Sequence, residues 1–407
     1  MTLYLFDDAA SDLWGPFALT RPIGELRFGD RLLRERLETF AGISARAALT
    51  RAWLAEFREA GAPPALPRDS ELGDGDRLFL SSRFVPDAGS RLGSLAVDAP
   101  VLLLAGNAVA GLWVPAGREG PDGGWLLEPG PFPGAVERDV AGAVLPWPWS
   151  LIERNRDRLA ADLASAGSGP RSLPEGVHLV GDGPLRIGAG VRIEPGVLLD
   201  TRGGGIRLDD GTEVLAGTRL AGPVHAGPAC RLLGGPIGGL SAGPRCRLRG
   251  EIEDAIVLGF SNKAHDGFLG HACLGRWVNL GALTTNSDLK NNYGSVRVEL
   301  ASGEVDTGLL KLGCLLGDHV KTAIGTLLAT GTLVGAGANL FGGDPPPRRV
   351  PAFAWGNGPG APTFDRERFL GTAAIAMDRR GVTCDDGTRA WLGACWDAAR
   401  DAGDAGG

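Results

Sequence analysis

The chain has 407 residues, with 48 acidic and 41 basic side chains and a formal net charge of −7. This length allows two or three domains with their own cores. The mild acidity argues against a nucleic-acid partner, whose binding surface would need clustered basic residues. No run of 18 apolar residues occurs, and the acidic first residues are unlike a signal peptide, so we expect no membrane span and a cytoplasmic protein.

Residues 1–155 have the pattern of an α/β domain. Apolar runs at 3–6 and 99–109 are typical of buried strands, and between them 29–40 has helical spacing with Asp30 as a plausible N-cap. This order of strand, helix and strand predicts an α/β fold with its ligand chemistry at the carboxyl ends of the strands.

After this domain the spacing of apolar residues along the sequence changes. Residues 145–167 are predicted to form an amphipathic connector helix, and from about residue 176 glycine becomes dense. An aliphatic residue then recurs at every sixth position, as in hexapeptide repeats, and this pattern predicts a left-handed parallel β-helix. The step is kept by Ile187, Ile193, Leu208, Val214, Leu220, Ala226, Leu232, Leu316, Thr322, Leu328, Val334 and Leu340.

These patterns give four predicted segments and an overall fold class. The fold class is an α/β N-terminal domain plus an all-β left-handed parallel β-helix with C-terminal helices. The segments are the α/β domain (1–155), a helical connector (156–175), the β-helix (176–343), and a Pro/Gly segment with two terminal helices (344–407). The polar stretches "SNKAHDGF" and "TTNSDLKNNYG" are predicted to be insertions, and repeat proteins place insertions on their binding face.

Lysine and asparagine are concentrated in this region of the β-helix. The chain has only four lysines, all within 59 residues, although arginine is used throughout; five of its nine asparagines lie in or beside residues 260–292. An ammonium and a guanidinium bind ligands differently. Lysines kept in a chain that otherwise uses arginine therefore indicate a specific role. The lysines are Lys263, Lys290, Lys311 and Lys321.

The same stretch carries a candidate catalytic set. A neutral imidazole at His265 could take a proton from an amine or a hydroxyl group. Lys263 could hold a phosphate or a carboxylate, and Asp288 could orient a base or bind an amine. The side-chain amides of asparagine could hold sugar hydroxyls. The six cysteines show no CxxC spacing, so no metal centre of the zinc type is predicted.

The architecture resembles the bifunctional N-acetylglucosamine-1-phosphate uridylyltransferase/glucosamine-1-phosphate acetyltransferase family, GlmU. It resembles more closely the GlmU-like group described as sugar nucleotidyltransferases. The motifs that carry this resemblance are "TRPIGELRFGDRLLRERL", "PWPWSLIERN", "FSNKAHDGFLGH", "NLGALTTNSDLKNNYG" and "LGDHVKTAIGT".

The resemblance implies an acyltransferase site in the β-helix, with acetyl-CoA or another acyl-CoA as co-substrate. His265 stands where that family has its catalytic histidine, and "NSDLKNN" matches a loop that meets acetyl-CoA and sugar. The resemblance also implies a homotrimer and a sugar phosphate or nucleotide sugar as partner. The implied acceptor-binding residues are Lys263, Asn279, Asn286, Asp288 and Asn291, and the implied acyl-CoA-binding residues are Lys290, Lys311 and Lys321.

The chain departs from the family at several binding positions. The glycine-rich nucleotide loop is missing, and Asn107 stands where the family has a carboxylate for Mg²⁺, so Mg²⁺ is expected only if nucleotidyltransferase activity is retained. Acidic Glu253 or Asp254 stands where a lysine would bind a sugar phosphate. The polar groups left for a nucleotide are Arg21, Asp7, Asp8 and Asn107.

Three functions are compatible with these residues. The first is an enzyme of nucleotide-sugar metabolism with an acyl-CoA-dependent site in the β-helix. The second is a Mg²⁺-dependent sugar-1-phosphate nucleotidyltransferase that acts in the N-terminal domain. The third is a non-catalytic trimeric scaffold that binds sugar nucleotides; the missing glycine loop favours it, and the retained lysine and asparagine cluster argues against it.

Overall fold

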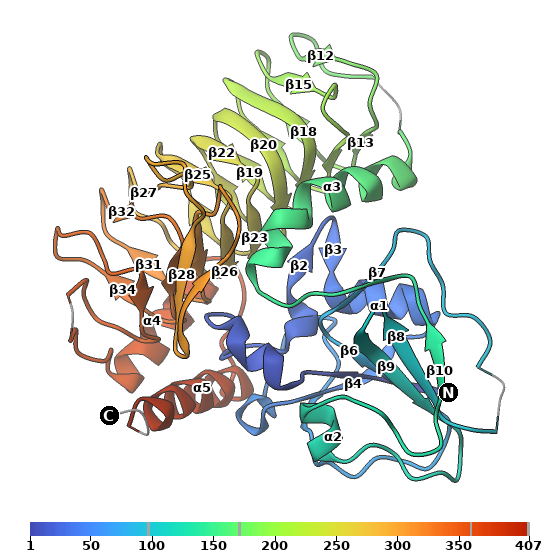
Figure 1. The fold of residues 1–407 in the computed structure, drawn as a ribbon. Helices are drawn as coiled ribbons and strands as arrows, with labels where there is room; N and C mark the ends of the chain where they lie inside the picture. The colour runs from blue at the N-terminus through green and yellow to red at the C-terminus, as the bar shows by residue number, and fades with distance from the viewer. Residues whose placement is uncertain (96–97, 170–171, 359, 405–407) are drawn as a thin grey trace.

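The computed structural model describes residues 1–95, 98–169, 172–358 and 360–404. A mixed α/β domain is followed by a parallel β-solenoid and by helices that pack at the far end of the solenoid (Figure 1). This confirms the predicted fold class, while the handedness of the coils stays a prediction. Within the described ranges no helix is long and apolar enough to cross a membrane.

The N-terminal domain is built on one sheet of seven strands in the described part of the chain. Strands β1, β4 and β6 are parallel, and β8 runs in the same direction because β9 lies antiparallel between it and β6. Their carboxyl ends therefore meet at one edge of the sheet. In spatial order the strands are β10 (Val136–Asp139), β8 (Val101–Ala105), β9 (Ala108–Val114), β6 (Arg77–Ser81), β1 (Thr2–Phe6), β4 (Ala45–Thr50) and β5 (Ala65–Pro67).

The helices match the predicted ones with one correction. Helix α1 (Leu33–Ala41) begins three residues after Asp30. The prediction of Asp30 as its N-cap is wrong, because this buried carboxylate is held by Arg31 at 2.7 Å and Arg207 at 3.2 Å. The other α-helices are α2 (Gly123–Leu127), α3 (Trp149–Ala166), α4 (Arg366–Asp378) and α5 (Asp386–Asp404).

The solenoid stacks short strands into parallel ladders, as the hexapeptide period predicted (Figure 1). One sheet contains β12 (His178–Val180), β13 (Leu185–Ile187), β15 (Leu198–Asp200), β16 (Ile206–Leu208), β18 (Thr218–Ala226), β20 (Gly235–Ala242), β22 (Glu251–Glu253), β23 (Ile256–Gly259), β25 (Phe268–Gly270), β26 (Cys273–Arg276), β30 (Cys314–Leu316), β33 (Thr332–Val334) and β35 (Arg349–Val350). Another contains β14 (Arg192–Ile193), β17 (Glu213–Val214), β19 (Arg231–Leu232), β21 (Arg247–Leu248) and β24 (Asn262–Lys263). Shorter pairs join β27 (Thr285–Asn286) to β32 (Leu327–Leu328) and β31 (Lys321–Thr322) to β34 (Asn339–Leu340).

One of the two predicted insertions is confirmed and the other is wrong. Residues 260–267 are not inserted; they continue the coils through β24 and the turn before β25. The observed insertion leaves the solenoid after β27, within the second predicted stretch, and returns at β30. It contains the antiparallel hairpin of β28 (Arg297–Leu300) and β29 (Gly303–Asp306). Polar composition therefore predicted the start of the insertion, but it also marked a stretch that keeps the repeat.

A buried arginine joins the N-terminal domain to the solenoid. Arg21 has no exposed surface and donates to Asp318 at 2.6 Å and to Glu59 at 2.9 Å. Thr20 also donates to Asp318, at 2.8 Å, and Arg276 contacts Glu59 at 3.1 Å. Burial by itself lowers the pKa of Arg21, but the two carboxylates outweigh it and hold the pKa above its ordinary value. The guanidinium is thus a charged bridge sealed from water.

Apolar packing surrounds this bridge. Trp14 and Phe17 of the N-terminal domain are fully buried in one cluster with solenoid residues such as Leu258, Cys273 and Leu315. Helix α3 lies along the solenoid beside β18 and β20, as Figure 1 shows in green against yellow. The N-terminal domain is therefore held against a solenoid face by both apolar and ionic contacts.

We predict that Arg21→Met lowers the free energy of unfolding by about 3–5 kcal/mol, because it leaves Asp318 buried without a counter-charge and Glu59 with Arg276 alone. Denaturant unfolding measures the change. The matched control is Arg192→Gln, which breaks an ion pair whose arginine is 76% exposed and should cost less than about 1 kcal/mol. Equal small losses in the two variants would contradict the role of Arg21.

Candidate functional site

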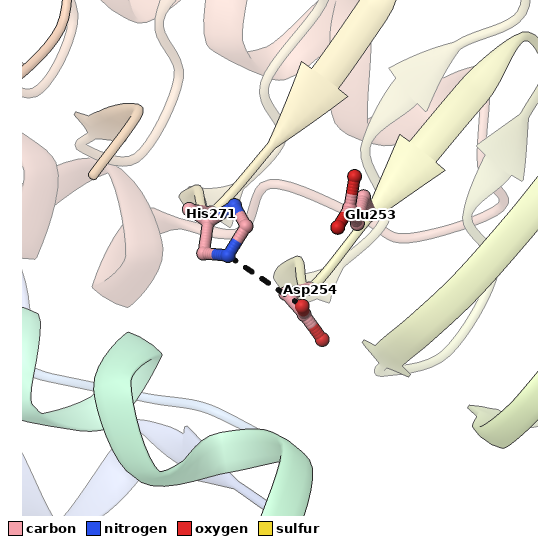
Figure 2. A group of neighbouring side chains, drawn as sticks. All are labelled: Glu253, Asp254 and His271. Carbon is pink, nitrogen blue, oxygen red and sulfur yellow. Dashed lines mark ion pairs between the residues drawn. The ribbon is translucent and has the colours of Figure 1, made fainter. Parts of the chain in front are cut away.

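The histidine with a geometry suited to catalysis is His271, which the sequence analysis did not select. Its Nδ1 lies 2.8 Å from Oδ2 of Asp288, and its Nε2 lies 3.5 Å from Oδ2 of Asp254. Figure 2 shows His271 and Asp254 facing each other, with Glu253 beside them. The side chains of His271, Asp254 and Asp288 are 12–16% exposed, so they are shielded but within reach of a ligand.

The solenoid repeat brings these groups together. Asp254, His271 and Asp288 follow one another at intervals of 17 residues and occupy the same corner on successive coils. Asp254 and His271 both have left-handed backbone conformations, with φ of 48° and 45°. The buried amide of Asn286 accepts from the main-chain N–H of Gly270 at 3.0 Å and donates to its carbonyl at 2.9 Å. This clamp fixes the backbone from which His271 projects.

Two cations balance the acids of this corner. Arg156 on α3 donates to Asp254 at 2.6 Å, and Lys311 lies 3.4 Å from Glu253. Glu253, Asp254 and His271 have the ligand types of a metal centre, and their ligand atoms lie within 4.8 Å of one another. Since a cation of the protein already binds each carboxylate, we assign no metal ion to this corner.

Asp288 is ionised in this setting. Burial raises the pKa of its carboxyl group, but the hydrogen bond and charge of His271, with the charge of Lys311, outweigh burial and lower the pKa. An ionised Asp288 accepts a hydrogen bond from Nδ1 of His271 and so orients Nε2 as the nitrogen that can exchange a proton with a ligand. Such a pair is the arrangement that orients a histidine base in hydrolases and transferases.

His265, the predicted base, lies at a different corner. Its side chain is exposed, and its main-chain carbonyl accepts from Lys263 at 2.9 Å. On the following coils this corner carries Leu283 and Ile324, which are 58% and 78% exposed. Main-chain hydrogen bonds from Leu283 to Asp266 and from Gly325 to Ala282 link the successive turns. His265 therefore stands beside an exposed apolar ridge.

The other predicted residues of the β-helix fall into three groups. Asn286 and Asp288 lie at the His271 corner, and Lys311 contacts Glu253 there. Asn279 and Lys321 line a groove between the solenoid and α4. Lys290 donates to the carbonyl of Ser295 at 3.0 Å inside the insertion, where Asn291 is exposed.

Lys263 is the residue whose predicted role the structure least supports. It continues an inward-facing ladder of Val214, Leu232 and Leu248, and it is 3% exposed. Its ammonium donates to the main-chain carbonyls of Arg249 and His265, both at 2.9 Å. A group held inside the coil in this way binds the main chain rather than a sugar phosphate.

The four residues predicted to bind a nucleotide in the first domain do not lie together either. Asp8 and Asn107 line a pocket of about 520 Å³ at the carboxyl edge of the sheet, together with Arg83 and Glu137. Asp7 is 1% exposed and binds Arg51 at 2.9 Å. Arg21 is sealed in the bridge to the solenoid, so its geometry does not support nucleotide binding.

The two predicted residues of the pocket at the sheet edge do not fit a Mg²⁺ ion. Asp8 accepts from Nε of Arg83 at 2.9 Å and from the main-chain N–H of Ser11 at 3.0 Å, so its carboxylate is already bound. Asn107 offers only a neutral amide, which binds Mg²⁺ less well than a carboxylate does. Neither predicted residue therefore supplies a free carboxylate for a divalent cation, and Glu137 is the remaining carboxylate of the lining.

We predict that burial of Lys263 makes the stability of the protein depend on alkaline pH. Burial lowers the pKa of this ammonium from 10.5 to about 8. Between these values the unfolded chain binds more protons than the folded chain, so stability rises with pH. Relative to Lys263→Met, the wild-type free energy of unfolding should rise on the order of 2–3 kcal/mol from pH 8 to 10.5.

The matched control for this titration is Lys311→Met, since Lys311 is exposed and its removal should leave the wild-type pH profile unchanged. Denaturant unfolding at several pH values measures each profile. Parallel profiles for the wild type and Lys263→Met would contradict a lowered pKa at Lys263.

Comparison with known proteins agrees with this architecture. Residues 3–169 match the family described as sugar nucleotidyl transferase. The bifunctional sugar-1-phosphate nucleotidylyltransferase/acetyltransferase of Sulfurisphaera tokodaii is 28% identical over 93 residues. That match covers 23% of this chain and 23% of the relative, so the chain spans only about a quarter of the length of the relative that it matches. The resemblance predicted from the sequence is confirmed, since residues 3–169 of this chain are similar to the sugar nucleotidyl transferase family.

Proposed function

We propose that this protein transfers an acyl group from an acyl-CoA to an amino group of a sugar phosphate or nucleotide sugar, at the solenoid corner that carries His271. The observation that supports this proposal is the 2.8 Å contact between Nδ1 of His271 and Asp288. It provides an oriented base on a rigid coil. The name of the relative, which includes an acetyltransferase, agrees with acyl transfer.

In the proposed reaction an acceptor ammonium first loses a proton to Nε2 of His271. The free amine attacks the thioester carbonyl; a C–N bond forms and the C–S bond breaks. The nitrogen then loses its second N–H proton, and the leaving thiolate takes up a proton to become the thiol of CoA. The products are an amide, a thiol and one proton released to water. Asp288 stabilises the imidazolium that forms in the first step.

The charges at this corner favour a cationic acceptor. Asp254 lies 3.5 Å from Nε2 of His271, so an ammonium that approaches the base also meets a carboxylate. Glu253 is 41% exposed at the edge of the same corner. These two acids stand where the resembling family would have a phosphate-binding lysine. We therefore propose that the acceptor presents its amine here and that its phosphate lies away from Asp254.

We also propose that the chain assembles as the predicted homotrimer. The apolar ridge of Leu283, Ile324 and Leu327 supports this, since these side chains are 57–78% exposed. Large apolar side chains gathered in this way are typical of a protein interface. Assembly through the ridge would bring His265 close to a neighbouring subunit, and this keeps His265 as the second candidate base.

We predict that His271→Asn lowers the rate of acetyl transfer from acetyl-CoA by about 10²–10⁴-fold, which is the usual contribution of a general base. Release of CoA thiol is measured with a panel of amino-sugar phosphates and nucleotide-linked amino sugars. The control His265→Asn should keep the rate within about threefold, as expected for an exposed histidine that does not act as the base. Light scattering should give the mass of three chains for the wild type and both variants, so that lost assembly is not mistaken for lost chemistry.

The reverse result, with loss of activity in His265→Asn alone, would refute His271 as the base and support the residue that the resemblance implies. Absence of transfer with every acceptor would refute acyl transfer. A mass of one chain would refute the trimer.

A second candidate function, nucleotide or nucleotide-sugar binding in the first domain, is favoured by a separate observation. The pocket of about 520 Å³ lies at the carboxyl ends of parallel strands, where α/β folds bind ligands. It belongs to residues that match the sugar nucleotidyl transferase family. Because Asp8 and Asn107 do not fit Mg²⁺, we derive no nucleotidyl transfer step.

We predict that UTP or dTTP binds this pocket equally well with Mg²⁺ and with a chelator, because Asp8 is already bound by Arg83 and Asn107 offers only a neutral amide to the ion. Calorimetric titration measures the binding. Asn107→Leu should weaken it roughly tenfold through the loss of a polar contact, and Asn107→Asp should make it depend on Mg²⁺. Asn291→Leu, at an exposed asparagine of the insertion, is the control. Wild-type binding that requires Mg²⁺ would contradict this description of the pocket.

A further inference from the structure

A basic groove lies between the solenoid and helix α4, apart from the His271 corner. Its volume is about 280 Å³. One wall is a ladder of outward-facing residues on four successive coils: Arg247, Asn262, Asn279 and Lys321. Coils stack ~4.8 Å apart, so this wall extends for ~14 Å. The opposite wall is formed by α4 and the residues just after it.

The lining of this groove carries four cations and no carboxylate. The cations are Arg247 and Lys321 from the solenoid, and Arg379 and Arg380 from the end of α4. Among the described residues, no carboxylate lies within ion-pair distance of any of the four. The Nε atom of Arg380 is buried and has no hydrogen-bond partner. Most other arginines discussed above are paired with acids, so this set is unusual within the molecule.

The cations of the groove repel one another. Burial lowers the pKa of Arg380, and the charges of Arg247 and Arg379 lower it further. Burial also lowers the pKa of Lys321 to about 8, since its ammonium contacts only the carbonyl of His319, at 3.2 Å. Like charges gathered without a counter-charge destabilise the folded chain, and a bound anion removes this cost.

The amides of the ladder add donors and fix orientation. Asn262 donates to Asn279 at 3.0 Å, which leaves the amide group of Asn279 free to donate toward the groove. The apolar lining of the groove consists of Phe260, Trp277, Val278, Ile375 and Ala376. A volume near the lower limit of about 300 Å³ for small-molecule pockets suits a phosphate with a small organic group.

We propose that this groove is a binding site for a small phosphate ester, held by Arg247, Lys321, Arg379 and Arg380. The groove is distinct from the His271 corner, because the two lie at opposite ends of β26. His271 lies just before this strand, and Trp277, which lines the groove, lies just after it. Six residues of extended chain separate the two by ~20 Å. The proposal rests on the groove alone and stands whether or not His271 is a base. Lys321, predicted from the sequence to meet CoA phosphates, is one of its four cations.

Two sources could supply the phosphate ester, and binding measurements with the full chain distinguish them. The probes are adenosine 3′,5′-bisphosphate, which carries the phosphate pattern of CoA, and α-D-glucose 1-phosphate. Calorimetric titration should give saturable binding of at least one of them. Preference for the bisphosphate identifies the acyl-CoA as the source, and preference for the sugar phosphate identifies the sugar substrate.

The variant that tests the site is Arg379→Gln, at an exposed residue that should not disturb the fold. It should weaken binding roughly ten- to a hundredfold, as expected for one charge-assisted hydrogen bond. Lys321→Gln should act in the same direction. The matched control, Arg46→Gln, removes an exposed arginine of the N-terminal domain and should leave binding unchanged. The proposal is overturned if neither probe binds, or if Arg379→Gln and Arg46→Gln bind the better probe equally.

Discussion

The buried guanidinium of Arg21 sets how the two halves of this protein fit together. It lies between Asp318 of the solenoid and Glu59 of the α/β domain, and Asp318 depends on it for neutrality, whereas Glu59 also pairs with Arg276. The planar fork of an arginine is better suited to two carboxylates than an ammonium is. A residue expected from the sequence to serve a nucleotide is used here to hold a domain interface. The α/β domain is consequently fixed against the solenoid, and its pocket at the sheet edge shares no lining residue with this bridge.

Much of the fold could be predicted because it follows from periodicity. A six-residue step, repeated along the chain, is compatible with few structures other than a solenoid, and the stacked ladder of Val214, Leu232 and Leu248 is its direct result. The insertion was harder to place. Polar composition distinguishes a binding face from the core but does not say where the chain leaves the repeat. The start of α1 was missed because Asp30 had an ion-pair partner 177 residues away, which no local pattern indicates.

The candidate site was predicted in its location and only partly in its residues. The concentration of lysine and asparagine pointed to the coils that carry the candidate site, yet the lysines have different contacts: Lys263 faces inward, Lys311 pairs with an acid, and Lys321 lines a groove. His271 was not selected, because the motif that resembles the family pointed to His265 and the spacing between successive coils was not used. The 17-residue spacing of Asp254, His271 and Asp288 was the available signal, since residues one coil apart share a corner. His225 also pairs with a carboxylate, that of Asp209, but its imidazole is 2% exposed and is contacted by Arg27, which shows that such a contact alone does not make a site.

The position of Lys263 also bears on how the solenoid reaches its correct alignment. Rungs of similar aliphatic residues can pair in several offsets with nearly equal energy, and a displaced rung would lose little burial. An ammonium in the ladder changes this, because the native offset supplies the carbonyl of Arg249 on the preceding coil as an acceptor beside the local carbonyl of His265. In a displaced arrangement the same charge would lose the acceptor at Arg249 and would be buried against aliphatic neighbours. The buried charge of Lys263 thereby gives an otherwise repetitive stack a unique alignment. The coils that it aligns are those that carry His265 and His271.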